Sequence, residues 1–209
     1  MTLTTLALAK GRTAKATIKL LAKANIHFPE FHADTRKLIF YDRERNIKML
    51  FVKAIDVPTY VTTGAADIGI VGKDNILESE ADVYEMLDLN IGNCQFVIAS
   101  KTVDSLSDVN HLTVASKYTN VAEKYFATKN ISIEAIKLNG SVELAPLIGM
   151  ADIILDIVET GTTLKENGLK PLKYIEDIST RLIVNQASFA TKTKQIQAII
   201  QQLQDVLED

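Results

Sequence analysis

The stretch DIVETGTTL, residues 156–164, combines residue types that could hold a phosphorylated sugar. Gly161 lets the backbone approach a ligand closely, and the N–H groups that open a following helix can bind phosphate oxygens. Asp156 and Glu159 suit the hydroxyls of a ribose, because those hydroxyls donate hydrogen bonds to carboxylates. Further donors are the hydroxyls of Thr160, Thr162 and Thr163. A Thr-capped helix after a glycine turn explains the same residues, so this stretch alone leaves both interpretations open.

Cationic residues lie next to two predicted strands. The sequence AKGR places Lys10, Gly11 and Arg12 directly after the strand expected at residues 3–9, where cations could meet an anion. Arg36 precedes the strand expected in KLIFYD. Solvated charges beside a turn or at a strand edge explain both groups without any ligand.

A third predicted strand, in ADIGIVG, contains an acid and glycines that could approach a ligand. These candidates are Asp67, Gly69 and Gly72. For the acid, a turn carboxylate that accepts local N–H groups is the simpler interpretation.

Composition and charge restrict the classes of protein to which the chain can belong. Its 209 residues suffice for one large domain or two small lobes, and 47% hydrophobic with 23% charged residues are typical of a globular protein. The net charge of −3 argues against nucleic-acid binding as the main activity, since such binding needs clustered Lys and Arg. Cys94 is the only cysteine, which excludes an intramolecular disulfide, and the three histidines are scattered, so no protein-held metal site is predicted.

Neither a membrane span nor an export signal is predicted. No apolar run approaches the roughly 20 residues that cross a bilayer. The start MTLTTLALAKGR lacks a basic region followed by a long apolar core, so we expect no signal peptide and a cytoplasmic protein.

Short β-rich apolar runs alternate with helical patterns along the chain, which indicates an α/β fold with mostly parallel sheets. Helices are expected at 13–26 and 58–64, in NVAEKYFATK and SVELAPLIG, and in the amphipathic segment TKQIQAIIQQLQDVL. A hairpin is expected around RERN, and RLIVNQASF is expected to form a late strand.

One local echo suggests that the chain forms two similar lobes. GAADIGIVG at 64–72 resembles GMADIILDIV at 149–158, and each follows a short helix that contains proline. Helix–Gly–Asp–strand junctions are common, so the echo alone leaves both readings open. Two lobes facing a central cleft would bind ligands outside the carboxyl ends of their strands. We expect residues 1–94 and 184–209 to form one lobe and residues 95–183 the other.

A longer match resolves the ambiguity of DIVETGTTL. From Glu143 onward, ELAPLIGMADIILDIVETGTTL resembles the signature of the ATP phosphoribosyltransferase family. ALAKGR, DVPTYVTTGAADIGIVGKD and TRLIVNQAS resemble further family segments in the same order, so the resemblance covers nearly the whole chain. It implies a two-lobed fold like the type II periplasmic binding proteins and transfer of phosphoribosyl from phosphoribosyl diphosphate to N1 of ATP, the first step of histidine biosynthesis.

The resemblance also implies roles for the candidate residues. Phosphoribosyl diphosphate would bind at Glu143 and at residues 156 and 159–163. ATP would bind at residues 10–12, Arg36 and Lys53, and at residues 67, 69 and 72. Arg12 and Arg36 would act in catalysis by meeting substrate phosphates. Many relatives have Arg where this chain has Lys53, which keeps the charge but loses bidentate geometry.

Length, cofactor and partners follow from the same resemblance. A chain of 209 residues resembles the short form of the family, a catalytic subunit that works with a separate regulatory protein resembling histidyl-tRNA synthetase. We expect a homodimer within a hetero-oligomer, with Mg²⁺ bound through the substrates' phosphates. Two alternatives are a ligand-binding module of the same architecture without chemistry, and a phosphoribosyltransferase for another base.

Overall fold

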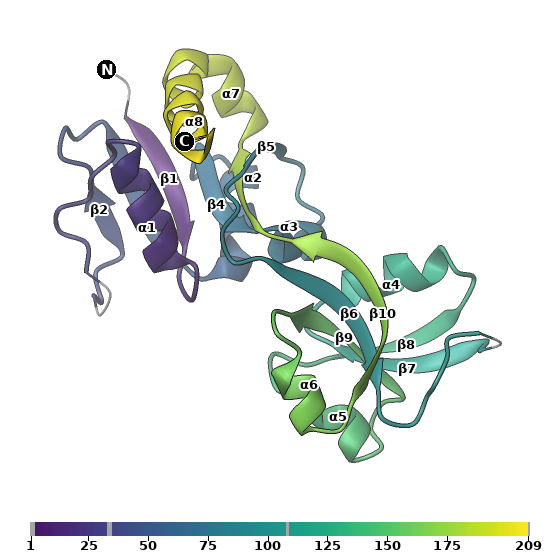
Figure 1. The fold of residues 1–209 in the computed structure, drawn as a ribbon. Coiled ribbons are helices and arrows are strands. Elements are labelled where there is room, and N and C mark those ends of the chain that lie inside the picture. The colour runs from purple at the N-terminus through teal and green to yellow at the C-terminus, as the bar shows by residue number, and fades with distance from the viewer. Residues whose placement is uncertain (1–2, 33–34, 108, 209) are drawn as a thin grey trace. The chain divides into compact units, whose positions relative to one another are not determined.

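The computed structural model describes residues 3–32, 35–107 and 109–208. The chain divides into two compact units, each with its own sheet. Unit 1 comprises Met1–Gly92 and Ser179–Asp209, and unit 2 comprises Asn93–Ile178 (Figure 1). The boundaries differ from the division at 94 and 184 expected from the sequence, because the strand that begins at Thr180 pairs within the unit 1 sheet.

Unit 1 is built on a 6-stranded sheet whose centre is parallel. The strand β1 pairs in parallel with β3 on one side and β4 on the other, and the outer strands are antiparallel to their neighbours. In sheet order the strands are β2 (Ile39–Tyr41), β3 (Ile47–Val52), β1 (Thr4–Ala9), β4 (Ile68–Gly72), β11 (Thr180–Val184) and β5 (Tyr84–Asp88).

Helices cover both faces of this sheet, and alternate residues of β1 pack against the helices of opposite faces. Successive side chains of a strand point to opposite faces. Leu6 and Leu8 therefore pack with the helices of one face, and Ala7 and Ala9 with those of the other. The first face carries α1 (Ala14–Lys23) and α8 (Thr193–Glu208), and the second carries α2 (Val57–Thr62) and α3 (Lys73–Ser79). The 3-10 helix η1 (Ala54–Asp56) leads into α2, and α7 (Gln186–Thr191) leads into α8.

Unit 2 has a 5-stranded sheet with a parallel centre of its own. The strand β7 pairs in parallel with β8 and β9, whereas β6 and β10 are antiparallel to their neighbours. The order is β10 (Lys170–Ile178), β6 (Cys94–Ser100), β9 (Ile153–Val158), β7 (His111–Ser116) and β8 (Ser132–Lys137). The helices are α4 (Thr119–Ala127), α5 (Leu144–Leu147) and α6 (Thr162–Glu166).

The two-unit α/β class is confirmed, but the expectation of mostly parallel sheets is wrong. Antiparallel pairs outnumber parallel ones within the described residues. The chain passes between the units directly from β5 to β6 and again from β10 to β11. Two parallel neighbouring strands need a crossover connection, which is usually a helix. These two connections contain no helix, and the strands that they join, β5, β6, β10 and β11, all pair with their neighbours in antiparallel fashion.

Three local expectations also need correction. The late strand stops at Val184, because Asn185 accepts a hydrogen bond from the Ser188 N–H at 2.8 Å and starts the helix α7. The helix expected in SVELAPLIG is limited to α5. The structure adds α3 and β5, which the hydrophobic pattern did not predict.

Candidate functional site

The cationic segment AKGR lies at the carboxyl edge of the parallel strands of unit 1. Ala9 pairs with Val52 at the ends of β1 and β3, and the Lys10 N–H continues this ladder to the Val52 carbonyl at 2.7 Å. Lys53 follows Val52 directly, so the segment 10–12 and Lys53 leave the sheet at the same edge. Gly72 ends β4, the other parallel neighbour of β1, and joins them there.

Arg36 comes to the same edge although it precedes an antiparallel strand. The Phe51 N–H donates to the Leu38 carbonyl at 2.8 Å, which extends the β2–β3 ladder toward the carboxyl end of β3. Two residues further back, Arg36 reaches the level of Lys53. Lys10, Arg12, Arg36 and Lys53 are all exposed, so four cations gather along this edge.

The glycines of unit 1 differ in what surrounds them. Gly11 has a φ of +119°, and no atom lies within 4 Å of the position that a Cβ would take, so its backbone is open to a ligand. Gly69 is buried inside the unit, where a Cβ would lie 2.7 Å from Val61 and 2.9 Å from Ile183. Gly69 therefore permits close packing of α2 and β11 on β4.

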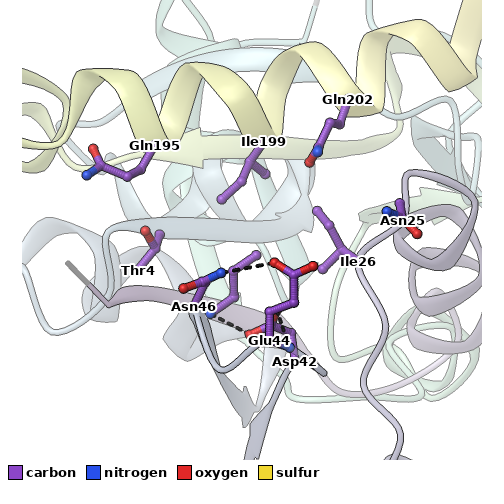
Figure 2. Close-up of a pocket in the computed structure, with 10 residues that line it drawn as sticks. Thr4, Asn25, Ile26, Asp42, Glu44, Asn46, Gln195, Ile199 and Gln202 are labelled. Atoms are coloured by element: carbon purple, nitrogen blue, oxygen red, sulfur yellow. Dashed lines mark hydrogen bonds between the residues drawn. The ribbon is translucent and has the colours of Figure 1, made fainter. Parts of the chain in front are cut away.

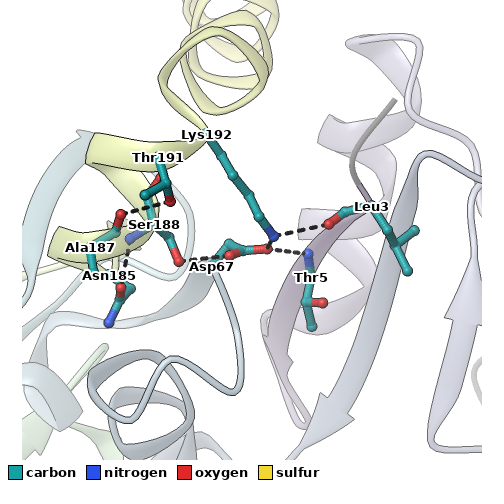
Figure 3. Close-up of polar contacts among 8 residues, drawn as sticks. All are labelled: Leu3, Thr5, Asp67, Asn185, Ala187, Ser188, Thr191 and Lys192. Carbon is teal, nitrogen blue, oxygen red and sulfur yellow. Dashed lines mark hydrogen bonds and ion pairs between the residues drawn. The ribbon is translucent and has the colours of Figure 1, made fainter.

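Asp67 lies at the opposite, amino edge of the sheet, just before β4. It is 5% exposed, and its carboxylate accepts hydrogen bonds from the Thr5 N–H at 2.8 Å and the Ser188 hydroxyl at 2.7 Å (Figure 3). Lys192 forms an ion pair with it at 2.8 Å and also donates to the Leu3 carbonyl. Asp67 thus fastens α7 and α8 to the start of β1, and the structure does not bring it together with the cations of the other edge.

These contacts change the acidity of Asp67. Burial is the largest single effect and would raise its pKa, but the hydrogen bonds from Lys192, Thr5 and Ser188 together outweigh it. The pKa of Asp67 therefore lies below its usual value of 3.8. The carboxylate of Asp67 is therefore ionised at neutral pH, as its ion pair with Lys192 requires.

In unit 2, Asp156 lies within β9 and the Thr-Gly-Thr-Thr segment follows that strand. Asp156 is half-buried and pairs with Val97 of β6. Gly161 adopts a left-handed φ of +75° and precedes α6, in which the Lys165 N–H donates to the Gly161 carbonyl at 3.1 Å. Since the first helical bond starts at Lys165, the N–H groups before it are the ones that an α-helix leaves without intrahelical acceptors.

The hydroxyls of this loop lie in solvent. The Thr160 and Thr162 hydroxyls are 3.0 Å apart, and the Thr162 N–H reaches the Thr160 hydroxyl at 3.5 Å. Glu159, Thr160, Thr162 and Thr163 are exposed. Leu164 is buried in the apolar core of unit 2 and anchors the loop there. The loop therefore exposes hydroxyls and N–H groups to solvent, while Leu164 holds it to the core of unit 2.

An apolar pocket of about 520 Å³ adjoins the same loop. Gly161, Leu164 and Tyr174 contribute to its lining. It lies between α6 and β10, and all of its lining residues belong to unit 2.

Glu143 reaches the same end of the unit 2 sheet by a different route. The loop that leaves β8 starts with the Leu138 N–H, which donates to the Ser116 carbonyl at the end of β7 at 3.0 Å. Glu143 ends this loop, half-buried, one residue before α5. The loops after β8 and β9 therefore both start from the carboxyl edge of the unit 2 sheet.

Sequence reasoning missed one residue that stabilises this edge. The Ser116 hydroxyl donates to the Leu155 carbonyl at 2.6 Å and accepts from the Tyr118 N–H at 2.8 Å, which joins the ends of β7 and β9. A serine at the end of an apolar strand was its only signal in the sequence.

No cluster of three or more His, Cys, Asp or Glu side chains that could hold a metal occurs in the described ranges. Over the same ranges, no helix is long and apolar enough to cross a bilayer.

Comparison with known proteins decides the family. A family model described as ATP phosphoribosyltransferase matches residues 53–205. An ATP phosphoribosyltransferase from Oceanobacillus iheyensis is 60% identical over 203 residues, which cover 97% of this chain and 98% of that protein. The chain belongs to the ATP phosphoribosyltransferase family.

Solved structures agree with this family membership. The ATP phosphoribosyl transferase (HisG:HisZ) complex from Thermotoga maritima contains a chain that matches with a TM-score of 0.86 and 33% identity, over 99% of each chain. The periplasmic aliphatic sulphonate binding protein SsuA from Escherichia coli matches with a TM-score of 0.59 over 99% of this chain and 73% of that one. At 12% identity, the second likeness shows the fold alone.

Proposed function

We propose that this protein transfers the phosphoribosyl group of phosphoribosyl diphosphate to N1 of ATP with release of pyrophosphate, the first step of histidine biosynthesis. The observation that carries the proposal is the 60% identity to an ATP phosphoribosyltransferase over 97% of the chain. The placement of the candidate residues other than Asp67 and Gly69 at or near the carboxyl edges of both parallel sheet centres supports it, because ligands of α/β sheets bind there.

Phosphoribosyl diphosphate binds to unit 2 in this proposal. The N–H groups and hydroxyls of residues 160–163 hold its 5′-phosphate, and Asp156 and Glu143 accept hydrogen bonds from its ribose hydroxyls. Glu159 shapes the turn and lies beside the sugar. The left-handed Gly161 supports the proposal, since a side chain there would strain the loop where it must approach the phosphate.

ATP and the departing pyrophosphate meet the cations of unit 1. Arg12 and Arg36 stabilise the negative charge that develops on the leaving group, while Lys10, Gly11, Lys53 and Gly72 bind ATP. No covalent protein nucleophile is needed, because positioning and electrostatic stabilisation suffice when charge separates at the ribose carbon. The buried contacts of Asp67 and the packing around Gly69 favour leaving both residues outside the ATP site.

Mg²⁺ accompanies the substrates through their phosphate oxygens. Mg²⁺ keeps several waters and is commonly held by one or two carboxylates plus substrate phosphates. It would neutralise phosphate charge, while Asp156 and Glu143 orient the ribose.

The protein works as the catalytic subunit of a hetero-oligomer in the cytoplasm, where ATP is available. A second type of subunit, resembling histidyl-tRNA synthetase, regulates it, and two copies of the present chain pair within the assembly. The likeness to a chain of the Thermotoga maritima HisG:HisZ complex supports this arrangement.

One assay tests the proposal. The protein is mixed with ATP, phosphoribosyl diphosphate and Mg²⁺, alone and with a regulatory subunit, and pyrophosphate and a new ultraviolet-absorbing adduct are measured. We expect both products in equal amounts. Absence of product under both conditions would favour a binding module, and pyrophosphate release with another base in place of ATP would favour a different phosphoribosyltransferase.

A further inference from the structure

A second recess of about 180 Å³ lies at the amino edge of the unit 1 sheet, away from the cationic edge. Figure 2 shows it between α8, which contributes Gln195, Ile199 and Gln202, and the turn between β2 and β3. The strand β1 begins in this recess with Thr4 and runs six residues to the opposite edge. At about 3.3 Å per residue, the recess and the AKGR segment are roughly 17 Å apart along the strand.

The recess is acidic and contains no cationic lining residue among those described. Asp42 and Glu44 both line it. Asp42 is already used, since it accepts the Ile47 N–H at 2.6 Å and the Glu44 N–H at 3.3 Å. Glu44 is exposed and accepts one hydrogen bond, from the Asn46 amide at 3.1 Å to one of its two oxygens. A carboxylate with capacity for a further donor therefore faces the recess.

The hydroxyl of Thr4, which opens into the recess, provides an independent sign of a polar ligand. Thr4 is 2% exposed, its side chain points from β1 toward α8 in Figure 2, and it lines the recess. Its backbone N–H donates to the Asn46 carbonyl at 3.0 Å, but no described residue forms a hydrogen bond with its hydroxyl. Among the described residues, the buried side-chain atoms without a hydrogen-bond partner belong to Thr17 and Arg181. The Thr4 hydroxyl is not one of them, so it is open to the recess and can accept a hydrogen bond from a ligand there.

We infer that this recess binds a small molecule that carries a guanidinium or protonated amine on a short alkyl chain. The head group donates to Glu44 and to the Thr4 hydroxyl. The alkyl chain of the ligand packs against the apolar lining residues Ile26, Ile47 and Ile199. A volume of about 180 Å³ holds about six water-sized groups, which such a molecule fills. The inference is independent of the proposed function, because it uses the opposite edge of the sheet.

The test uses n-propylguanidinium as the probe and n-propylurea as an uncharged molecule of matched shape. Calorimetry on the full chain is expected to give a dissociation constant of about 1 mM or tighter for the guanidinium, and no measurable binding of the urea. Glu44→Gln keeps an acceptor for Asn46 but removes the charge, so the guanidinium should bind about tenfold more weakly. Glu123→Gln makes the same charge change at an exposed position of α4 and should leave the affinity unchanged.

Thr4→Val provides a second variant with the hydroxyl replaced by a methyl of similar shape. It should weaken guanidinium binding about threefold or more, while the thermal unfolding temperature stays close to that of wild type. Three outcomes would each overturn the inference: no guanidinium binding to wild type, equal binding of the urea, or equal losses in Glu44→Gln and Glu123→Gln.

Discussion

The two units use one device at the amino ends of their parallel strands. In unit 1, Thr5 of β1 and Asp67 exchange two hydrogen bonds, from the Thr5 N–H to the carboxylate and from the Asp67 N–H to the Thr5 carbonyl, both at 2.8 Å. In unit 2, Thr113 of β7 and Asp152 exchange the same two bonds, at 2.7 and 3.0 Å. The sequence echo at 64–72 and 149–158 is therefore a structural repeat of this junction.

The surroundings of the two aspartates differ. Asp67 is buried, and Ser188 of α7 and Lys192, which joins α7 to α8, add to its partners. Asp152, by contrast, is exposed. One unit thus uses the junction to fasten the C-terminal helices, and the other leaves it at the surface. We therefore expect the loss of Asp67 to lower the free energy of unfolding more than the loss of Asp152, because removing one partner of a buried ion pair is costly.

The carboxyl ends of the repeated strands differ as well. After β4, the helix α3 begins directly at Lys73. After β9, residues 159–161 form a loop with a left-handed glycine before α6. The amino ends are alike, while the carboxyl ends differ: a helix follows β4 directly, and the loop proposed to bind phosphate follows β9. Variants at matched positions should therefore affect stability at the amino ends and activity at the carboxyl ends.

The largest effect is expected at the cationic edge of unit 1. Arg36→Ala should lower turnover about a hundredfold, the usual cost of removing one donor that stabilises developing charge. Its unfolding free energy should stay unchanged, because Arg36 is exposed. Arg43→Ala, an equal charge change in the turn before β3 at the other edge, is the control. Pyrophosphate release measures both, and equal losses would remove Arg36 from the site.

The two aspartates provide the second contrast. Asp67→Ala should lower the unfolding free energy by about 3 kcal/mol, since it leaves Lys192 and the buried donors without their acceptor. Asp152→Ala should cost about 1 kcal/mol, the contribution of a more exposed hydrogen bond. Urea unfolding of both variants tests the difference, and equal costs would show that the covering helices add nothing.

The pH dependence of stability should distinguish Asp67 further. Its pKa is lowered in the folded state, so its contribution to stability is present above the unfolded value of about 3.8 and is lost as pH falls through the lower folded pKa. Asp67→Asn removes this titration, so the stability gap between wild type and variant should narrow below pH 3.8. A gap that stays constant from pH 6 to pH 2 would contradict the role of the ion pair.

Gly161 and Gly149 are a matched pair on either side of β9. Their φ values are +75° and +73°, and no atom lies closer than 3.9 Å to a Cβ at either position. Gly161→Ala and Gly149→Ala should therefore each cost about 1 kcal/mol of backbone strain. Only Gly161→Ala should also weaken phosphoribosyl diphosphate binding, by several-fold in calorimetry. Equal affinities would mean that the loop does not touch the phosphate.

These contrasts also show where sequence reasoning succeeded. The strands β1, β4 and β9 were predictable from apolar runs, and α8 from isoleucines and leucines at helical spacing, because burial selects both patterns. The strand β5 was missed because its sequence YEMLD has no buried residue, which weakens the pattern. The start of α7 was predictable from Asn185, a residue type that often caps helices, but the prediction of a strand through residue 189 overlooked it.

The role of Asp67 was beyond the reach of local patterns. Its partners Thr5, Ser188 and Lys192 lie 62, 121 and 125 residues away in the sequence. Only the fold brings them together, whereas the loop at 160–163 is contiguous and could be proposed as a ligand site from the sequence, with the help of the longer match from Glu143.

Calorimetric titration of Asp156→Ala with phosphoribosyl diphosphate tests whether the end of β9 binds this substrate. We expect the variant to keep its fold, since Asp156 is only half-buried, and to bind phosphoribosyl diphosphate at least tenfold more weakly than wild type. An unchanged affinity in a folded variant would contradict the assignment of the β9 end as the ribose and phosphate site.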